Sequence, residues 1–278
     1  AGLFAAHVPT EFGGDGADAL AACLVIEEVA RVCASASLIP AVNKLGSLPL
    51  ILSGSKEQKE RWLRPLAQGK GFSYCLSESE AGSDASALKT KAERKGDGWV
   101  INGSKKWISN AGESEFYTVI AQTDPSLGSK GITAFVLEKS DSGVSFGAPE
   151  KKMGFRGSPT REVYFDNVEI GDDRRISEVG KGFALAMDTL DHTRITIAAQ
   201  ALGIAQGALD GGISGIYAYP GTPSTEITEY VQASKFAKEN NIAHDVCGKV
   251  VAAVDKSELP FMDKIFENGV ANNTEGIE

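Results

Sequence analysis

The chain has 278 residues, of which 42% are hydrophobic and 23% are charged, and its formal net charge is −9. This composition is typical of a globular protein with one large domain or two ordinary ones. The negative charge argues against nucleic acid and anionic membranes as partners, because long-range repulsion opposes both.

The four cysteines, at positions 23, 33, 75 and 247, show no spacing typical of metal ligands or of a redox pair. Their places inside apolar runs predict reduced, buried thiols, and therefore a cytoplasmic protein without a metal site. No apolar run reaches the roughly 18 residues of a membrane span, and we expect no leader peptide.

The first long helix is predicted over residues 17–36, an apolar run interrupted only by Glu27, Glu28, Arg31 and Ser35. These four positions form one stripe of a helix, so the other faces should be buried in a bundle. We interpret the two glutamates as solvated, without a catalytic role.

A second helix is predicted to begin at Ser55, because Ser55 and Gln58 have the Ser-x-x-Gln spacing of a capping box. This helix carries Trp62 and Leu63 and should end near Pro65.

From residue 72 to about residue 179 the apolar pattern changes to a period of two, which predicts a β domain. Its strands are expected over residues 72–76, 116–121, 131–137, 144–146 and 162–165. Asn102-Gly103 between apolar residues predicts a type I′ hairpin turn. On the strand that follows, Trp107 and Ser109 should share one face.

The loop after the first strand has the composition of a ligand site. Residues 77–84 bring together hydroxyls, carboxylates and a glycine, and their backbone N–H groups are free to point at a ligand. Read without any relative, such a pattern is more often an ordinary turn of an antiparallel sheet.

The residue pattern resembles that of a known family. Residues 74–84 read Tyr-Cys-Leu-Ser-Glu-x-x-Ala-Gly-Ser-Asp, and residues 102–111 read Asn-Gly-x-Lys-x-Trp-Ile-Ser-Asn-Ala. Together they are similar to the flavin-binding middle domain of the acyl-CoA dehydrogenases. Residues 153–160 and 163–168 continue that pattern, although Gly171 stands where a proline is usual.

The resemblance implies an α+β fold with four parts. Residues 1–71 form an N-terminal helical domain that lacks the family's first helix, and residues 72–179 form a middle antiparallel β-barrel domain that holds the flavin and acyl-CoA site. Residues 180–210 form the first helix of the C-terminal domain, and residues 211–278 form an unrelated tail. We expect this foreign α/β tail to pack poorly.

The activity that the resemblance implies is FAD-dependent α,β-dehydrogenation of acyl-CoA thioesters. The residues implied to bind FAD are Tyr74, Cys75, Leu76, Ser77, Gly82, Ser83, Trp107, Ile108 and Ser109. Those implied to bind acyl-CoA are Ser83, Asp191 and Arg194. The family also implies an electron-transfer flavoprotein as partner and a homotetramer.

Two charged groups have simpler alternatives. Asp191 and Arg194 lie three residues apart on one helix, where a plain intrahelical ion pair is equally expected, and His192 is expected at the surface. Lys151 and Lys152 could meet phosphates, but a solvated pair is the favoured interpretation.

The catalytic base is not found. In most family members the glutamate lies in the C-terminal bundle, and in a minority it occupies the position of Thr193, which cannot act as a base. Glu226, Glu229 and Glu239 are unassigned alternatives. The chain is therefore either a dehydrogenase, impaired in activity, or an inactive remnant that at most binds flavin or acyl-CoA.

The sequence changes character after residue 210, because six glycines and prolines arrive by residue 223 and no long helix tolerates them. Residues 207–232 resemble indolepyruvate–ferredoxin oxidoreductase α chains, and residues 236–278 resemble FAD-dependent hydroxy-acid oxidases and glycerol-3-phosphate dehydrogenases. We expect a composite chain with helices over 223–240 and 259–268 and a strand over 246–254.

Overall fold

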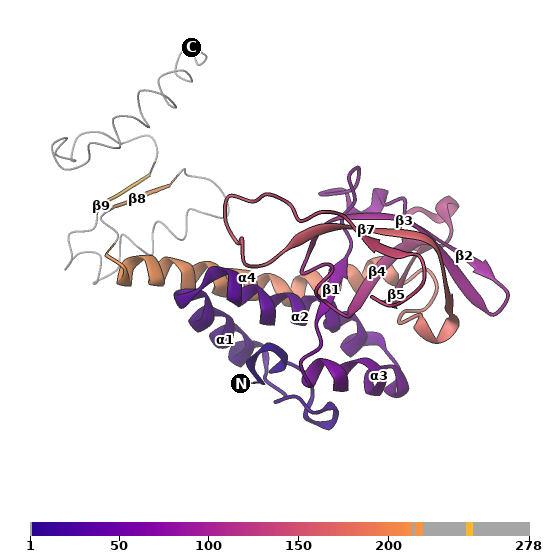
Figure 1. Ribbon diagram of the computed structural model, residues 1–278, viewed down its shortest axis with the longest axis horizontal. Coiled ribbons are helices and arrows are strands. Elements are labelled where there is room, and N and C mark those ends of the chain that lie inside the picture. Colours follow the sequence, from indigo (N-terminus) through magenta and orange to yellow (C-terminus); the bar gives the residue numbers. More distant parts are fainter. Residues whose placement is uncertain (1, 213–214, 219–242, 247–278) are drawn as a thin grey trace, which may run out of the picture. The chain divides into compact units, whose positions relative to one another are not determined.

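The computed structural model describes residues 2–212, 215–218 and 243–246. The chain divides into two units, Ala1–Gly207 and Ala208–Glu278. The first contains a helical layer, a sheet domain and most of one long helix (Figure 1).

The helical layer consists of two short 3-10 turns, η1 (Gly2–Ala5) and η2 (Thr10–Phe12), and the helices α1 (Ala19–Val32), α2 (Ala34–Ser53) and α3 (Lys56–Ala67). The helix predicted over residues 17–36 is wrong as a single element. Cys33 has the extended backbone angles φ −151° and ψ 104°, and it divides the run between α1 and α2.

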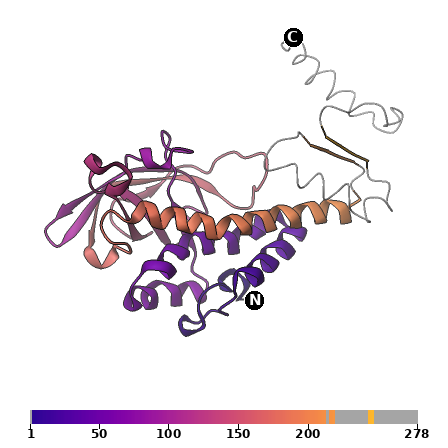
Figure 2. The same ribbon diagram turned by 180° about the vertical axis from the view of Figure 1, so that it is seen from behind.

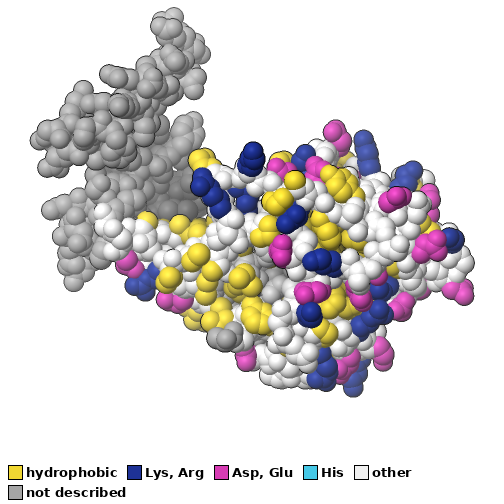
Figure 3. Space-filling view, viewed as in Figure 1, with side chains coloured by type: hydrophobic (Ala, Val, Ile, Leu, Met, Phe, Trp, Pro, Cys, Tyr) yellow, Lys and Arg dark blue, Asp and Glu magenta, His cyan; other side chains and the backbone are white. Residues whose placement is uncertain are grey.

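The predicted burial of α1 is also wrong. Only one stripe of it is buried, formed by Ala22, Ile26 and Ala30, which are spaced four residues apart. Leu20 and Leu24 are exposed, and Val32 is 88% exposed. Because α1 lies at the edge of the layer, its outer apolar side chains face outward, and Figure 3 shows apolar side chains gathered where α1 lies in Figure 1. Cys33 is likewise exposed rather than buried.

Helix α3 begins with the predicted capping box. The Ser55 hydroxyl accepts from the Gln58 N–H at 3.2 Å, and the Gln58 side chain accepts from the Ser55 N–H at 2.8 Å. The helix continues two residues past Pro65, to Ala67. Trp62 and Leu63 are buried, as expected for its inner face.

The sheet domain contains β1 (Phe72–Cys75), β2 (Lys91–Lys95), β3 (Gly98–Ser109), β4 (Phe116–Gln122), β5 (Ile132–Glu138), β6 (Val144–Phe146) and β7 (Thr160–Gly171). Strand β4 pairs with β5 along one edge. Its other edge is shared by β1 and, at Gln122, by β2. The sheet then continues through β3 and β7 to β6. The β1–β4 pairing is parallel, which the strand pattern did not predict.

Two apolar cores cover the two faces of the sheet, as period-two strands require. Phe72, Tyr74 and Leu76 point into the core shared with the helical layer. Cys75 and Tyr117 point into the second core, which β3, β4, β5 and β7 enclose. Both faces of β1 and β4 are therefore buried.

Helix α2 approaches β1 so closely that the contact requires a glycine. A Cβ on Gly46 would lie 2.8 Å from the carbonyl carbon and oxygen of Phe72. The Thr118 hydroxyl on β4 donates to the Gly46 carbonyl at 2.7 Å, and the Asn43 side chain accepts from the Phe72 N–H at 2.9 Å. These contacts hold β1 under α2. By length and composition α2 could also span a membrane, but 61% of its apolar window is buried, which favours a core helix.

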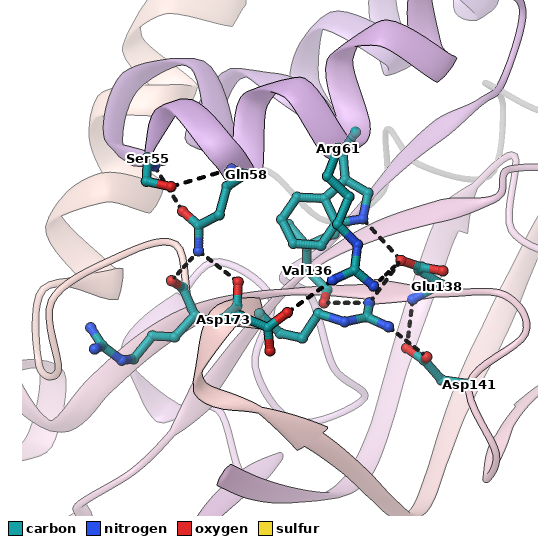
Figure 4. Close-up of polar contacts among 10 residues, drawn as sticks. Ser55, Gln58, Arg61, Val136, Glu138, Asp141 and Asp173 are labelled. Atoms are coloured by element: carbon teal, nitrogen blue, oxygen red, sulfur yellow. Dashed lines mark hydrogen bonds and ion pairs between the residues drawn. The ribbon is translucent and has the colours of Figure 1, made fainter. Parts of the chain in front are cut away.

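A polar cluster joins α3 to the sheet (Figure 4). The Glu138 carboxylate accepts from Arg61 and from the Trp62 indole, each at 3.1 Å. Arg174, which is buried, pairs with Glu138 at 3.2 Å and with Asp141 at 2.9 Å. These charged groups fix α3 against the ends of β5 and β7, because each carboxylate is shared by partners from different elements.

Helix α4 (Gly182–Asp210) runs along α1 and α2 in both ribbon views (Figures 1 and 2). A Cβ on Gly203 would lie 2.1 Å from the Glu27 carbonyl oxygen, and one on Gly207 would lie 2.1 Å from that of Arg31. Two glycines one turn apart therefore let the backbones of α4 and α1 come into contact. The Gln200 amide also donates to the Ser37 hydroxyl of α2 at 2.7 Å.

In the second unit the described strands β8 (Gly215–Ala218) and β9 (Ala243–Val246) pair in parallel. The predicted helices over 223–240 and 259–268 lie outside the described residues. Of the strand predicted over 246–254, only Val246 is described, and there it is the last residue of β9. The α+β architecture of residues 1–210, with a helical layer, a curled sheet and a following helix, is confirmed.

Candidate functional site

The end of β1 and the end of β3 lie side by side, and this brings the two motif segments together. The Lys106 N–H donates to the Ser77 carbonyl at 2.8 Å, directly after β1. The Ser73 hydroxyl, within β1, donates to the Ser109 carbonyl at 2.8 Å. Residues 76–78 and 105–109 therefore lie against each other, although they are distant in sequence.

A buried ion pair holds this junction. Lys105 has a fully buried side chain, and its ammonium donates to the Glu78 carboxylate at 2.7 Å and to the Leu76 carbonyl at 3.0 Å. Glu78 also accepts from the N–H groups of Lys89 and Thr90, at 2.6 and 3.0 Å. Burial alone would raise the pKa of Glu78, but Lys105 and these donors together hold it below its usual value. The loop of residues 76–90 is thus fixed at both ends.

The structure corrects the sequence interpretation of β3. The hairpin turn lies at Gly96-Asp97, where Lys95 pairs with Gly98, and not at Asn102-Gly103. Asn102 lies instead opposite a bulge of β7, and its side-chain oxygen accepts from the Asn167 N–H at 2.8 Å. Asn102 and Gly103 instead belong to an irregular part of a long strand, because the Gly96-Asp97 turn already joins β2 to β3.

A second bulge occurs at Trp107. Between the pairs Lys105–Val163 and Ile108–Arg161, Lys106 and Trp107 face the single residue Glu162. Trp107 has φ +62° and is 57% exposed. The bulge breaks the strand alternation before Trp107, whereas Ile108 is buried between the more exposed Trp107 and Ser109. That Trp107 and Ser109 share one face therefore stays a prediction. The bulge presents the indole to solvent next to the Ser77 segment.

The side chains of the three residues before Ser77 enter different cores, which limits how each can contact a ligand. Tyr74 and Leu76 belong to the core beneath the helical layer, whereas Cys75 belongs to the second core. Burial raises the pKa of the Cys75 thiol to about 12, so this thiol is inert. Ile108 is buried in the same core as Cys75. Any ligand contact of Cys75 or Ile108 must therefore come from the backbone.

Tyr74 carries an unusual polar group. Its hydroxyl is buried and has no hydrogen-bond partner. Buried hydroxyls normally have a partner, because an unpaired one loses its hydration without compensation. The Tyr74 hydroxyl is therefore available to hydrogen-bond with a polar group of a ligand.

The remaining predicted cofactor residues lie on an open loop. Gly82 and Ser83 are exposed, and a Cβ on Gly82 would meet no atom within 4 Å. The turn before them is closed by hydrogen bonds between Glu78 and Ala81 at 3.0 and 3.3 Å. A ligand can approach the backbone at Gly82 without steric hindrance.

On α4, Asp191 and Arg194 form the intrahelical ion pair that was one of the two expectations, with 2.5 Å between Oδ1 and Nη1 and both side chains exposed. His192 lies at the surface, as predicted, and contacts Asp188. Within the described residues, no hydrogen bond joins this pair to the loop of residues 77–84.

Thr193 is buried, and its hydroxyl donates to the Thr189 carbonyl at 2.8 Å. It therefore holds its proton in a hydrogen bond and cannot act as a base. Glu226, Glu229 and Glu239 lie outside the described residues. Within the described chain, no group of three or more potential ligands for a metal ion occurs.

The interpretation of Lys151 and Lys152 as a solvated pair is wrong for Lys152. Its ammonium donates to the Ser158 carbonyl at 2.5 Å and to the Thr160 hydroxyl at 2.9 Å. The loop of residues 151–159 folds back and half-buries this lysine, whereas Lys151 is exposed.

Sequence reasoning missed the residues that support the site. Besides Glu78 and Lys105, Asn110 has φ +59°, and its side chain accepts from the Ser158 hydroxyl at 2.7 Å. Its N–H donates to the Pro159 carbonyl at 2.7 Å. No local pattern marked the buried pair, because Glu78 lies in a polar loop and Lys105 is flanked by Ser104 and Lys106.

A helical layer lies on a curled sheet, and a serine-containing loop is fixed beside a bulged tryptophan. Three family descriptions match in succession: acyl-CoA dehydrogenase N-terminal domain over residues 1–70, middle domain over residues 73–168, and C-terminal domain over residues 180–214. Over residues 1–214 the chain belongs to the acyl-CoA dehydrogenase family.

Individual relatives agree. A probable acyl-CoA dehydrogenase of Mycobacterium leprae, fadE25, is 60% identical over 213 residues, which are 76% of this chain and 55% of the relative. The solved butyryl-CoA dehydrogenase of Megasphaera elsdenii is 40% identical with a TM-score of 0.73, over 76% of this chain and 57% of that one. An acyl-CoA dehydrogenase of Bacillus anthracis complexed with FAD is 35% identical with a TM-score of 0.70, over 76% and 36%.

The chain thus spans about half the length of the curated relatives that it matches. The family matches end at residue 214. The composite origin of the remaining tail stays a prediction.

Proposed function

We propose that this chain is an FAD-dependent acyl-CoA dehydrogenase, an oxidoreductase that removes the α and β hydrogens of an acyl-CoA thioester. The observation that carries the proposal is the junction of the two motif segments, where Ser77 bonds to Lys106 and Ser73 bonds to Ser109. This junction brings serine hydroxyls, the backbone of the loop of residues 77–84 and the exposed Trp107 indole close together.

The residues present fit FAD. The unpartnered Tyr74 hydroxyl, the open backbone at Gly82 and the solvent-facing Trp107 offer a polar partner, room for phosphates and a stacking surface. FAD, when bound, supplies the acceptor for the hydride that leaves the β carbon. The related Bacillus anthracis structure is described as a complex with FAD, which supports the same cofactor here.

The chain's own residues would position the reactants. Ser77 and Ser109 would edge the flavin ring, where a hydroxyl at Ser109 can stabilise negative charge near the ring nitrogen. Ser83 would contact both cofactor and acyl-CoA. Asp191 and Arg194, which are exposed on α4, are proposed contacts of the CoA arm.

Removal of the α proton of the substrate requires a general base. Thr193 already donates its proton to Thr189, so the described residues assign no base. A missing general base costs about 10²- to 10⁴-fold in rate, so we expect impaired turnover. The second candidate function is therefore an inactive module that binds flavin or acyl-CoA.

Two further proposals follow from the family alone: an electron-transfer flavoprotein as redox partner and a homo-oligomer. A cytoplasmic location is proposed from the cysteine pattern. The net charge of −9 disfavours nucleic acid and anionic membranes as partners, because both repel a negatively charged protein.

The test has two steps, both with the whole chain. The purified protein is mixed with FAD and passed through a desalting column, and retained flavin is measured by its absorbance. Butyryl-CoA is then added without oxygen. Retained flavin that bleaches supports the dehydrogenase. Retained flavin that stays coloured supports the flavin-binding module, and unretained flavin contradicts the dehydrogenase and supports the inactive remnant.

A further inference from the structure

A cavity of about 390 Å³ lies in the first unit, apart from the junction of β1 and β3. The segment after η1, the start of α1, one face of α2 and one face of α4 enclose it. Most of its lining is apolar and includes Leu48, Ile51 and Ile195. It shares only Asp191 with the residues proposed above for acyl-CoA, and none with those proposed for FAD. Its size is within the range of small-molecule pockets.

Lys44 is the unusual residue of this cavity. It lies on α2, lines the cavity, and is only 7% exposed. Among the residues that the structure describes, it has no hydrogen-bond or ion-pair partner. A largely buried lysine without a counter-charge is costly, and burial accordingly lowers the pKa of Lys44.

The other polar groups around Lys44 are already engaged. Asp18 caps α1 by accepting from the Ala21 N–H at 2.8 Å, Asp191 pairs with Arg194, and His192 contacts Asp188. The His7 ring bonds to the Ser47 hydroxyl at 2.8 Å, and burial together with Lys44 lowers its pKa to about 3, so it is neutral. The Cys23 thiol is the remaining ionisable neighbour.

One largely buried cation without a partner, beside the apolar side chains Leu48, Ile51 and Ile195, fits an amphiphilic monoanion. We propose that this cavity binds a short carboxylic acid with an unbranched apolar chain, whose carboxylate pairs with the Lys44 ammonium and whose chain packs against Leu48, Ile51 and Ile195. A dianion would be disfavoured, because only one cation lacks a partner and the Asp18 and Asp191 carboxylates would repel a second charge.

The test is titration calorimetry of the whole chain without FAD, with hexanoate and, as a neutral probe of equal length, hexanol. We expect hexanoate to bind saturably and more tightly than hexanol. The Lys44→Met variant should weaken hexanoate binding roughly tenfold or more, because it loses a charge-assisted hydrogen bond. It should bind hexanol as the wild type does. Lys151→Met, at an exposed lysine, is the matched control and should change neither affinity.

The Lys44→Arg variant keeps the charge and should retain hexanoate binding, which separates loss of charge from loss of structure. It also serves if Lys44→Met does not fold. Absence of saturable hexanoate binding, or equal hexanoate affinity in the wild type and in Lys44→Met, would overturn the proposal. Because flavin is absent throughout, failure here leaves the dehydrogenase proposal untouched.

Discussion

At the scale of single residues, the Glu78–Lys105 pair is the group on which the candidate site depends. Three donors surround its carboxylate: the Lys105 ammonium and the N–H groups of Lys89 and Thr90. Removing one partner of such a pair costs more than the pair contributes, because the other charge is left buried and unpaired. The role of the pair is therefore structural, because it fixes the loop that carries Ser77 against β3.

Replacing Lys105 with Met should lower the free energy of unfolding by about 3–5 kcal/mol, because Glu78 stays buried without its cation. Urea unfolding followed by circular dichroism measures this. Adding Glu78→Gln to Lys105→Met should restore part of the loss. The matched control is Lys106→Met, at the half-exposed pair with Glu162, which should cost about 0–1 kcal/mol. Equal losses at positions 105 and 106 would contradict the structural role of the buried pair.

His7 should make stability depend on pH. Its pKa is about 3 in the folded chain, against 6.5 for a free histidine, because burial and the nearby Lys44 disfavour the charged ring. The unfolded chain therefore binds more protons between these values, so stability from this group rises with pH from about 3 to 6.5 and is lost on acidification. His7→Gln should flatten that part of the profile in urea unfolding at a series of pH values.

At the scale of elements, the sequence predicted β-strands well and their irregularities poorly. The strands over residues 116–121, 131–137 and 144–146 lie within one or two residues of β4, β5 and β6. The Asn-Gly signal failed because a competing turn, Gly96-Asp97, closes the hairpin and a partner strand supplies the bulge opposite Asn102. Such a bulge depends on the register between β3 and β7, which no local pattern contains.

The crossing of α4 and α1 depends on Gly203. Leucine there would meet the Glu27 carbonyl, so Gly203→Leu should destabilise the chain by about 1–3 kcal/mol through overpacking, despite the better helix propensity of leucine. Thermal unfolding by circular dichroism gives the comparison with Ala201→Leu, at an exposed position of the same helix. A neutral Gly203→Leu would contradict the close approach of the two helices.

At the scale of the whole molecule, the residue pattern predicted the layers and the motif segments, but not how the site is held. Family resemblance placed Ser77 and Trp107 in one site, whereas the contacts that join them come from Lys106 and from Ser73 of the parallel strand β1. These contacts join positions far apart in sequence. Similarly, the apolar stripe of α1 could not reveal which faces lie at the edge of the layer.

The first unit contains both apolar cores, whose described members all lie before residue 191. We therefore expect a chain that ends at Gly212 to unfold in the same cooperative transition as the whole chain, with an unchanged midpoint temperature. Differential scanning calorimetry of the two proteins side by side measures this. A lower midpoint for the shorter protein would mean that the cores draw stability from residues after 212.

The parallel partnership of β1 with β4 has a consequence for synthesis. A nascent chain leaves the ribosome at about 5–20 residues per second, so Phe72 waits on the order of seconds before Phe116 emerges to pair with it. During that interval Asn43, already synthesised, can occupy the Phe72 N–H and keep this apolar segment beneath α2. We therefore expect the helical layer to cover one face of β1 before β4 has been synthesised.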